Sequence, residues 1–337
     1  CFELVNYNSY TKNNGGPITL YEPISRAYSK LWEILCNFKI LEKNKRSYNY
    51  CALAEGPGGF VECFINYRKK QFQGKYDNIY CISLIEKDKQ VPDWSKISKY
   101  MKSKKKDKIK ILYGKDKTGN LYNLENIKYL QENIPQKCEL VTADGGFDYS
   151  IDFNKQEQLS YHLIFCEIVS AFTILKKNGK FFLKIFEIHT NLTVKFIYLL
   201  NNYFENVFIT KPYVSRPANS EKYLICKNFR TIEKQNLENL FTLVLQWNKL
   251  KDNEYINNLF NFELPKFYKK IVSMSNYYYT KKQIKNIIST LFLINAKLDK
   301  NNKKTLMSKQ VIYSLVWCEK YNKSKNFKFK FLELIKK

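Results

Sequence analysis

Two lysines and two carboxylates of this sequence have types and positions that could support proton transfer: Lys30, Asp144, Lys184 and Glu221. Lys184 lies inside the apolar run Lys180-Phe-Phe-Leu-Lys-Ile-Phe186. This is unusual, because charged side chains are rarely buried without a partner. A desolvated lysine beside a second cation loses proton affinity and can act as a general base near neutral pH. The alternative is an edge strand from which Lys184 reaches water.

The turn Glu55-Gly-Pro-Gly-Gly-Phe60 is a second element that could serve chemistry. It follows the apolar run Tyr48 to Ala54 and precedes the helix-like stretch Phe60 to Arg68. Glycine lets the backbone approach a ligand closely, and the first turn of the helix offers free N–H groups. The pattern therefore indicates a nucleotide-type site, and the alternative is a tight turn in an α/β core.

The elements that must position these residues alternate between strand-like and helix-like segments from residue 48 to 229, which favours an α/β fold with a largely parallel sheet. The predicted strands are Tyr48 to Ala54, Asn78 to Ile85, Lys108 to Tyr113, Glu139 to Ala143, Lys180 to Phe186, Asn206 to Thr210 and Lys222 to Lys227. Ligands of such sheets bind outside the carboxyl ends of the strands, where the glycine turn and Asp144 lie.

Helical spacing predicts helices before, within and after the sheet. Ile24 to Phe38 carries Lys30, and Gln156 to Lys176 is predicted to end in a basic last turn before Gly179. After residue 230 the sequence is predicted to be mainly helical, with an apolar face on Gln283 to Leu298. We therefore expect an N-terminal segment (1–47), an α/β domain (48–230) and a helical C-terminal region (231–337).

The composition indicates a globular protein with an anionic partner. The formal charge of +26 favours nucleic acid. The alternative is compositional drift of an AT-rich genome, which also enriches Lys, Asn, Ile and Tyr. The run Lys102 to Lys110 is interpreted as a solvated loop, with nucleic-acid contact as the second reading.

The nine cysteines include no CxxC pair, and only two histidines are present. This pattern predicts reduced thiols in the core, and it argues against a disulfide framework and a structural zinc site. No apolar run approaches the roughly 18 residues of a membrane span, and no signal peptide is visible. We expect a cytoplasmic protein. Because the chain begins at Cys1 without a methionine, we also expect it to be a fragment.

In its order along the chain, the set Lys30, Asp144, Lys184 and Glu221 resembles the K-D-K-E tetrad of the FtsJ-like RNA 2′-O-methyltransferases. Residues 20 to 230 further resemble the Adrift-type cap-specific mRNA (nucleoside-2′-O-)methyltransferases. The motifs that carry this resemblance are Ala54 to Phe60, Tyr113 to Tyr122, Ala143 to Phe147 and Lys211 to Tyr223. Asn120 departs from the family, which often has an acidic residue there. Neither Glu86 nor Asp88 is a convincing ribose ligand, so Asp116 is preferred for the cofactor.

The resemblance implies a Rossmann-type methyltransferase sheet with an antiparallel last strand, S-adenosylmethionine as cofactor and no metal. It implies Lys184 as the general base, Lys30 as the group that depresses its pKa, and Asp144 and Glu221 as groups that orient the lysines. The implied cofactor-binding residues are Ser25, Glu55, Gly56, Pro57, Gly58, Gly59, Phe60, Asp116 and Asp144. The implied substrate-binding residues are Ser215, Arg216, Asn219, Ser220 and Glu221, with a structural ion pair as the alternative for Arg216.

The implied partner is RNA, in particular capped mRNA, and the implied reaction is methylation of a cap-proximal ribose. One alternative is a methyltransferase of ribosomal or transfer RNA, and another is a catalytically silent RNA-binding scaffold of the same fold. The C-terminal region is expected either to bind another capping or transcription protein or to brace the catalytic domain. A large cytoplasmic DNA virus, such as an asfarvirus, would suit the composition.

Overall fold

The computed structural model describes residues 3–6, 8–71, 76–85, 93–101, 108–147, 152–250, 256, 258–296 and 299–335. In this part of the chain, a seven-stranded sheet has the order β3-β2-β1-β4-β5-β7-β6. Its strands are β1 Asn49–Leu53, β2 Asn78–Ile82, β3 Lys108–Ile111, β4 Cys138–Ala143, β5 Leu175–Ile185, β6 Phe204–Thr210 and β7 Lys222–Phe229. Each predicted strand is found, with bounds shifted by a few residues. Glu86, Asp88, residues 102–107 of the predicted basic loop and the last two lysines lie outside the described residues.

The sheet is mixed, as the sequence predicts. Strands β1 to β5 pair in parallel, whereas β7 runs antiparallel to both β5 and β6. The antiparallel last strand is therefore confirmed. Every residue of β1 is buried, as expected for a parallel strand that is covered by helices on both faces of the sheet.

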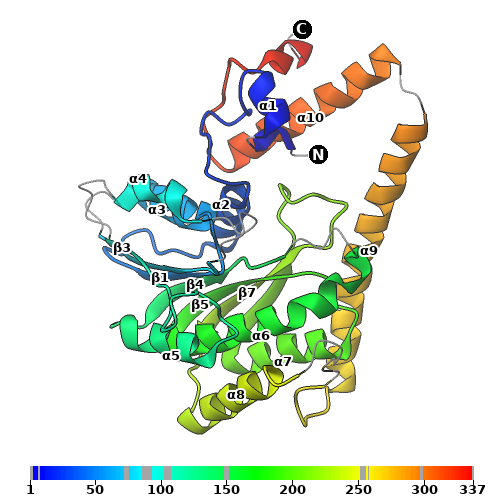
Figure 1. The fold of residues 1–337 in the computed structure, drawn as a ribbon. Helices are drawn as coiled ribbons and strands as arrows, with labels where there is room; N and C mark the ends of the chain where they lie inside the picture. The colour runs from blue at the N-terminus through cyan, green and yellow to red at the C-terminus, as the bar shows by residue number, and fades with distance from the viewer. Residues whose placement is uncertain are drawn as a thin grey trace.

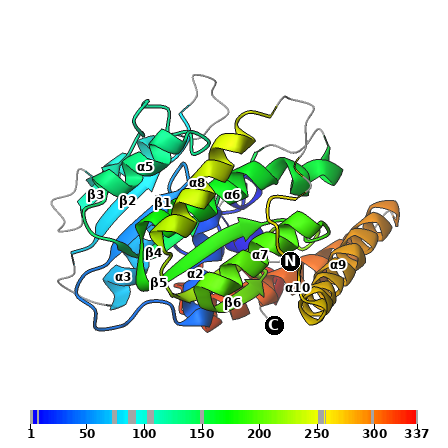
Figure 2. The same cartoon turned by 90° about the horizontal axis from the view of Figure 1, so that it is seen from below.

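Helices cover the two faces of the sheet in separate layers (Figures 1 and 2). One face carries α2 (Ala27–Phe38), α3 (Gly59–Gln71) and the short α4 (Ser98–Met101). The other carries α5 (Leu124–Asn133), α6 (Gln156–Ile174) and α7 (Asn191–Tyr203), with α8 (Lys234–Trp247) packed against α6. The predicted helices around Lys30 and after the glycine turn are thus present.

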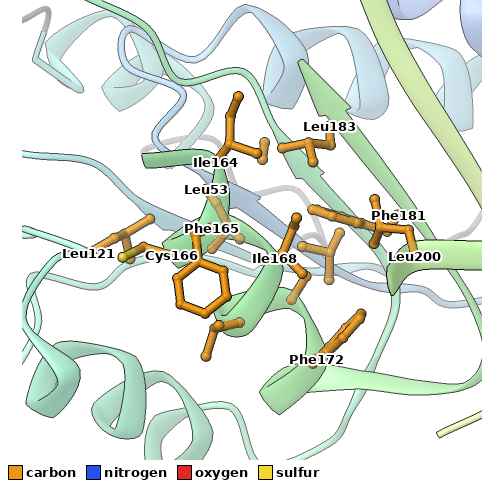
Figure 3. Close-up of a cluster of buried hydrophobic side chains, with 14 of the residues drawn as sticks. Leu53, Leu121, Ile164, Phe165, Cys166, Ile168, Phe172, Phe181, Leu183 and Leu200 are labelled. Carbon is orange, nitrogen blue, oxygen red and sulfur yellow. The ribbon is translucent and has the colours of Figure 1, made fainter. Parts of the chain in front are cut away.

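Because side chains along each strand point alternately to the two faces of the sheet, the core is divided into two apolar clusters. In β5, Phe181 and Leu183 join the cluster below the sheet with Phe165 and Ile168 of α6 (Figure 3). Phe182 points to the opposite face and packs in the cluster that contains residues of α2 and α3. Successive strand residues face opposite sides, so this strand connects both halves of the core while it carries Lys184 to the carboxyl ends of the parallel strands.

The predicted end of the long helix is wrong. Helix α6 ends at Ile174, and the residues expected to form its basic last turn already belong to β5. Leu175 pairs with Cys138 of β4, and the register shifts before Lys180 pairs with Leu140. Pairing with β4 therefore overrides the local helix-stop signal. The left-handed residue is Asn178 (φ 64°) and not Gly179, which was expected to stop the helix.

The C-terminal region is helical, as predicted. Helix α9 (Lys266–Asn295) runs along one side of the molecule, and α10 (Lys300–Lys320) returns to the N-terminal segment (Figure 1). The short elements there are η1 Glu3–Val5, α1 Ser9–Asn13 and η4 Lys330–Ile335; η2 Ser95–Ile97 and η3 Phe153–Lys155 precede α4 and α6. Among the described residues, no helix has the length and apolarity needed to cross a membrane.

Candidate active site

A cavity of about 590 Å³ opens at the carboxyl ends of β1 and β4. These two strands are neighbours, and the chain continues from them to helices on opposite faces of the sheet. Ligands of α/β sheets bind at such a position. The lining comes from the segments that follow β1, β2, β3 and β4, from β5 and α6, and from the segments before α2 and β7. Its residues include Ser25, Gly56, Pro57, Ser83, Leu84, Gly119, Asn120, Leu121, Tyr122, Asp144, Gly145, Gly146, Leu163, Lys184 and Glu221.

The glycine turn forms one wall of this cavity. Gly56 and Pro57 line it, whereas Gly58 and Gly59 serve the packing behind it. Gly58 has φ 102°, and a Cβ there would lie 2.2 Å from Cγ1 of Ile97. A side chain at Gly59 would meet the hydroxyl oxygen of Ser25 at 2.0 Å. The glycines therefore allow the turn, α3 and the segment before α2 to approach one another.

Glu55 and Phe60 lie behind the turn and outside the cavity lining. The carboxylate of Glu55 accepts a hydrogen bond from the N–H of Phe60 at 2.7 Å, so it caps the first turn of α3. Burial raises the pKa of Glu55 well above its ordinary value. Phe60 is fully buried and packs against the ring of Tyr223, 6.1 Å between centroids. Both residues shape the turn from within the core.

Asp116 holds the loop that carries Gly119 and Asn120 to the cavity. Its carboxylate accepts hydrogen bonds from the N–H and hydroxyl of Thr118 and from the side-chain amides of Asn123 and Asn126. Burial by itself would raise the pKa of Asp116, but these donors together lower it. Asp116 is exposed and does not appear in the cavity lining, so it supports the loop and is not itself a lining residue.

The first charged pair of the site joins α2 to the segment before β7. The Nζ atom of Lys30 lies 2.8 Å from Oε2 of Glu221, and both side chains are largely buried. The hydroxyl of Ser215 donates to the other carboxylate oxygen of Glu221 at 2.8 Å. Since both oxygens are occupied, the carboxylate is fixed in place and in turn fixes Lys30.

The second charged pair joins β5 to the end of β4. The Nζ atom of Lys184 donates to the backbone oxygen of Asp144 at 2.8 Å and lies 3.4 Å from Oδ1 of that residue. The hydroxyl of Tyr223 donates to the same Oδ1 at 2.7 Å. Lys184 does not reach bulk water from an edge strand, because β5 lies inside the sheet and the exposed fraction of its side chain is 12%.

The two pairs form one electrostatic unit. Burial by itself would raise the pKa of Glu221, but the positive charges of Lys30 and Lys184 lower it to about 2. The carboxylate is therefore ionised at neutral pH and interacts with both lysines. The structure thus brings together Lys30, Asp144, Lys184 and Glu221, which the sequence had placed on four separate segments.

The predicted substrate residues occupy the segment between β6 and β7 and do not all face the cavity. Asn219 and Glu221 line it. Ser215 and Ser220 are buried, and the hydroxyl of Ser220 donates to the side-chain oxygen of Gln156 at 2.8 Å. Arg216 is exposed and does not line the cavity.

Two residues of the site had not been singled out from the sequence. Tyr223 lies two residues after Glu221, so strand alternation directs both to the same face, and this was the available signal. Glu167 lies in the apolar part of α6 and accepts a hydrogen bond from the N–H of Gly145 at 3.1 Å. Burial raises the pKa of Glu167 to about 8. A carboxylate among buried residues is the same kind of signal that drew attention to Lys184.

Comparison with known proteins gives a consistent match over this region. Residues 23–229 match a family model described as FtsJ-like methyltransferase. Cap-specific mRNA (nucleoside-2′-O-)-methyltransferase 1A of Caenorhabditis briggsae is 32% identical over 196 residues, which cover 56% of this chain and 21% of the relative. Inactive cap-specific mRNA (nucleoside-2′-O-)-methyltransferase 1B of the same organism is 30% identical over 196 residues, 56% of this chain and 22% of that protein.

Among solved structures, one described as a ribosomal RNA methyltransferase from Plasmodium falciparum is 20% identical, with a TM-score of 0.41. The alignment covers 62% of this chain and 99% of that structure. The chain spans about a fifth of the length of the two C. briggsae relatives.

Proposed function

Because the chain belongs to the FtsJ-like methyltransferase family, we propose that it transfers a methyl group from S-adenosylmethionine to a ribose 2′-hydroxyl of RNA, at a cap-proximal nucleotide of mRNA. The observation that carries this proposal is that two ion pairs lie at a cavity beside the glycine turn. One joins Lys30 to Glu221, and the other joins Lys184 to Asp144. The cap-specific part rests on the named activity of the C. briggsae relative.

The residues around the cavity fit this cofactor. The hydroxyl of Ser25 is buried without a hydrogen-bond partner among the described residues and lines the cavity, so it offers a polar contact to the methionine part. Gly56 presents backbone without a side chain, and the carboxylate of Asp144 offers a negative charge that would suit a sulfonium group. When bound, S-adenosylmethionine supplies a methyl group whose carbon–sulfur bond breaks as the 2′-oxygen attacks, leaving the electron pair on sulfur.

Lys184 is the group in this site that can take the proton of the 2′-hydroxyl. A ribose hydroxyl is a weak acid, so a base must accept its proton as the new carbon–oxygen bond forms. The carbonyl and carboxylate oxygens of Asp144 orient Nζ of Lys184, and Tyr223 holds that carboxylate in turn. After transfer, the proton resides on Nζ of Lys184, and the resulting charge is balanced by Asp144.

Lys30 contributes a fixed positive charge to the same site. Its Nζ atom is held by Glu221, whose second oxygen is bound by Ser215. A preorganised cation stabilises negative charge that develops on the attacking oxygen without a reorganisation cost during the reaction. That Lys30 also lowers the pKa of Lys184 stays a prediction from the resemblance to the family.

The test is transfer of labelled methyl groups to capped and uncapped transcripts, followed by mass mapping of the modified nucleotide. We expect incorporation at a cap-proximal ribose. We expect Lys184→Met to lower the rate by about 100-fold or more and to retain the thermal shift that the cofactor produces. Lys180→Met is the matched control, because Lys180 lies on the same face of β5 and outside the cavity lining.

Three outcomes would contradict parts of this proposal. Full activity of Lys184→Met excludes this lysine as the base. Equal methylation of uncapped ribosomal or transfer RNA favours the second reading, an enzyme of those RNAs. Tight RNA binding with no methyl transfer by the wild-type chain favours a silent scaffold, a fate that the name of one relative documents for that protein. A cytoplasmic location and a viral origin stay predictions from the sequence.

A further inference from the structure

A second cavity, of about 510 Å³, lies on the other side of the segment between β6 and β7. Its walls come from α2, from this segment and from the C-terminal helices α9 and α10, which Figure 1 shows in orange. The lining includes Glu33, Asn37, Lys211, Tyr213, Ser215, Asn219, Ser220, Lys222, Tyr278, Tyr279, Lys282, Asn286 and Lys320. The family match ends at residue 229, so the helices α9 and α10 lie beyond the matched region.

The lining of this second cavity is rich in lysines. Four lysines line it, at positions 211, 222, 282 and 320, and within the described ranges none of them forms an ion pair with a carboxylate. Glu33 is the one acidic residue of the described lining. Its oxygens accept hydrogen bonds from the N–H of Tyr213 and from Nε1 of Trp317, and burial raises its pKa. The cavity therefore suits an anion.

Two of these lysines are held in place from within the protein. The Nζ atom of Lys211 donates to the backbone oxygens of Asn219 and Glu221, both at 2.8 Å. Lys222 is only 3% exposed, and its Nζ atom donates to the backbone oxygen of Ser220 at 2.7 Å. Burial lowers the pKa of Lys211 to about 7 and that of Lys222 to about 8. A bound anion would restore the charge that burial disfavours.

Aromatic rings stand at the mouth of the same cavity. Tyr213 and Tyr278 are 58% and 52% exposed. The Nζ atom of Lys320 lies 5.3 Å from the ring centroid of Tyr213, and that of Lys282 lies 4.1 Å from the ring centroid of Tyr278. Exposed aromatic faces beside lysines are the combination that binds single-stranded nucleic acid, because bases stack on the rings and phosphates contact the cations.

The second cavity adjoins the active site. Asn219 lines both cavities. Ser215 lines the second cavity while its hydroxyl holds Glu221 of the first. An RNA strand whose ribose reaches Lys184 would therefore pass Asn219 and extend into the second cavity.

We propose that the second cavity binds a phosphate and a base of the RNA substrate next to the acceptor nucleotide, so that α9 and α10 form part of the substrate site. This inference rests on the proposed function in taking RNA as the substrate. It assigns the C-terminal helices a direct contact with that substrate, whereas a bracing role would leave them without one.

The first experiment compares Lys282→Gln with Lys285→Gln in binding a labelled ten-nucleotide single-stranded RNA by fluorescence anisotropy. Lys282 and Lys285 are both exposed on α9, but only Lys282 lines the cavity. We expect Lys282→Gln to raise Kd about fivefold and to lower the slope of log K against log salt by about 0.7, as for one lost phosphate contact. Lys285→Gln should change Kd by less than about twofold. Equal effects of the two variants would overturn the proposal, since general surface charge would explain them.

The second experiment tests the base contact with Tyr278→Ala, and Tyr277→Ala serves as control. Tyr277 is 66% exposed on the same helix and does not line this cavity. We expect Tyr278→Ala to weaken RNA binding about tenfold and to raise KM for RNA with unchanged kcat. An unchanged Kd would contradict the base contact.

The outcomes separate this inference from the proposed function. RNA affinity is measured without methyl transfer, so the comparison of Lys282→Gln with Lys285→Gln can be read even if the wild-type chain is inactive. If the wild-type chain methylates RNA and the two variants bind it alike, the inference fails and the proposed function stands. A competition experiment with adenosine monophosphate tests whether the cavity binds a free nucleotide instead of RNA. Loss of its binding in Lys282→Gln with unaltered RNA affinity would overturn the proposal.

Discussion

Helices α6 and α9 are both long and both rich in apolar side chains, but they are buried to very different extents. Fourteen of the 19 residues of α6 are buried, whereas Val272 is the one buried residue among the 30 of α9. α6 is enclosed by the sheet and by α5, α7 and α8. The apolar residues near the end of α9 are largely exposed, among them Ile284, Ile288, Leu291, Phe292 and Ile294.

The contacts of α9 with the α/β layers combine apolar packing of Val272 and Tyr268 with hydrogen bonds. The hydroxyl of Tyr279 donates to the backbone oxygen of Ile209 in β6 at 2.8 Å, and the amide of Asn276 contacts Nδ1 of His189 at 2.9 Å. Helical spacing of apolar residues therefore predicts a helix in both cases, but it does not predict what covers the apolar face. The difference also predicts that α6 belongs to the cooperative core and that α9 opens at a lower free energy.

The largest expected effect is on the packing of α6. Phe165 is fully buried and lies among Phe196, Trp247 and Phe260. Phe165→Ala should lower the free energy of unfolding by about 3–5 kcal/mol, because it removes apolar contact and leaves a cavity. Phe292→Ala on α9 is the matched change, and since Phe292 is 72% exposed it should stay within about 0.5 kcal/mol of the wild type. Urea unfolding measures both. A similar loss in the two variants would mean that α9 is covered in solution.

The second prediction concerns the buried carboxyl of α6. The pKa of Glu167 is raised by burial to about 8, above its ordinary value of 4.5. The folded state thus binds this proton more tightly than the unfolded state, so stability from this group is complete below pH 4.5 and is lost as pH rises to 8. Over this window the wild type should lose unfolding free energy on the order of 3 kcal/mol, and Glu167→Gln should not show this loss.

The measurement is the difference in unfolding free energy between Glu167→Gln and the wild type at several pH values. It should grow in favour of the variant as the pH rises from mildly acidic to mildly basic. A difference that is constant with pH would mean that Glu167 is ionised in the fold. The control is Glu263→Gln in the segment before α9, an exposed carboxyl that should show no such trend.

The sequence could predict the strands, the helices and the four charged residues for separate physical reasons. The strands follow from short apolar runs between turns, and Lys184 stands out because a charge within such a run needs a partner. Tyr223 and Glu167 were not singled out, since their roles depend on which side chains meet Asp144 and Gly145 in space.

Other features could not be predicted from local pattern at all. The end of α6 depends on pairing of Leu175 with Cys138 in a neighbouring strand. The second cavity depends on α9 lying beside the segment between β6 and β7, which is distant from it in the sequence, so neither the lysines nor the tyrosines carry a signal by themselves. Long-range contacts of this kind decide which polar residues converge.

A third and smaller effect should come from His162, also on α6. Its ring is stacked between Tyr122 and Trp247, at centroid distances of 3.9 and 4.9 Å. Burial lowers its pKa to about 4, below the ordinary 6.5. The folded state therefore prefers the neutral ring, and stability is lost as pH falls from 6.5 to 4. We expect a loss of about 2 kcal/mol after allowance for partial exposure. His162→Phe keeps the stack and should abolish this part of the acid sensitivity in pH-dependent urea unfolding; an unchanged pH profile would contradict the assignment.

The smallest effect should be local to α9 and directly probes how this helix is attached. Tyr279→Phe removes the hydrogen bond to the backbone oxygen of Ile209 and should lower the free energy of opening of α9 by about 1 kcal/mol. Native-state hydrogen exchange measures this as faster exchange of the α9 amides, while the amides of α6 keep their rates because their core is untouched. Tyr277→Phe is the control, since no hydrogen bond of its exposed hydroxyl is present among the described residues. Equal acceleration in α6 and α9 would show that the two helices open as one unit and would remove the contrast between them.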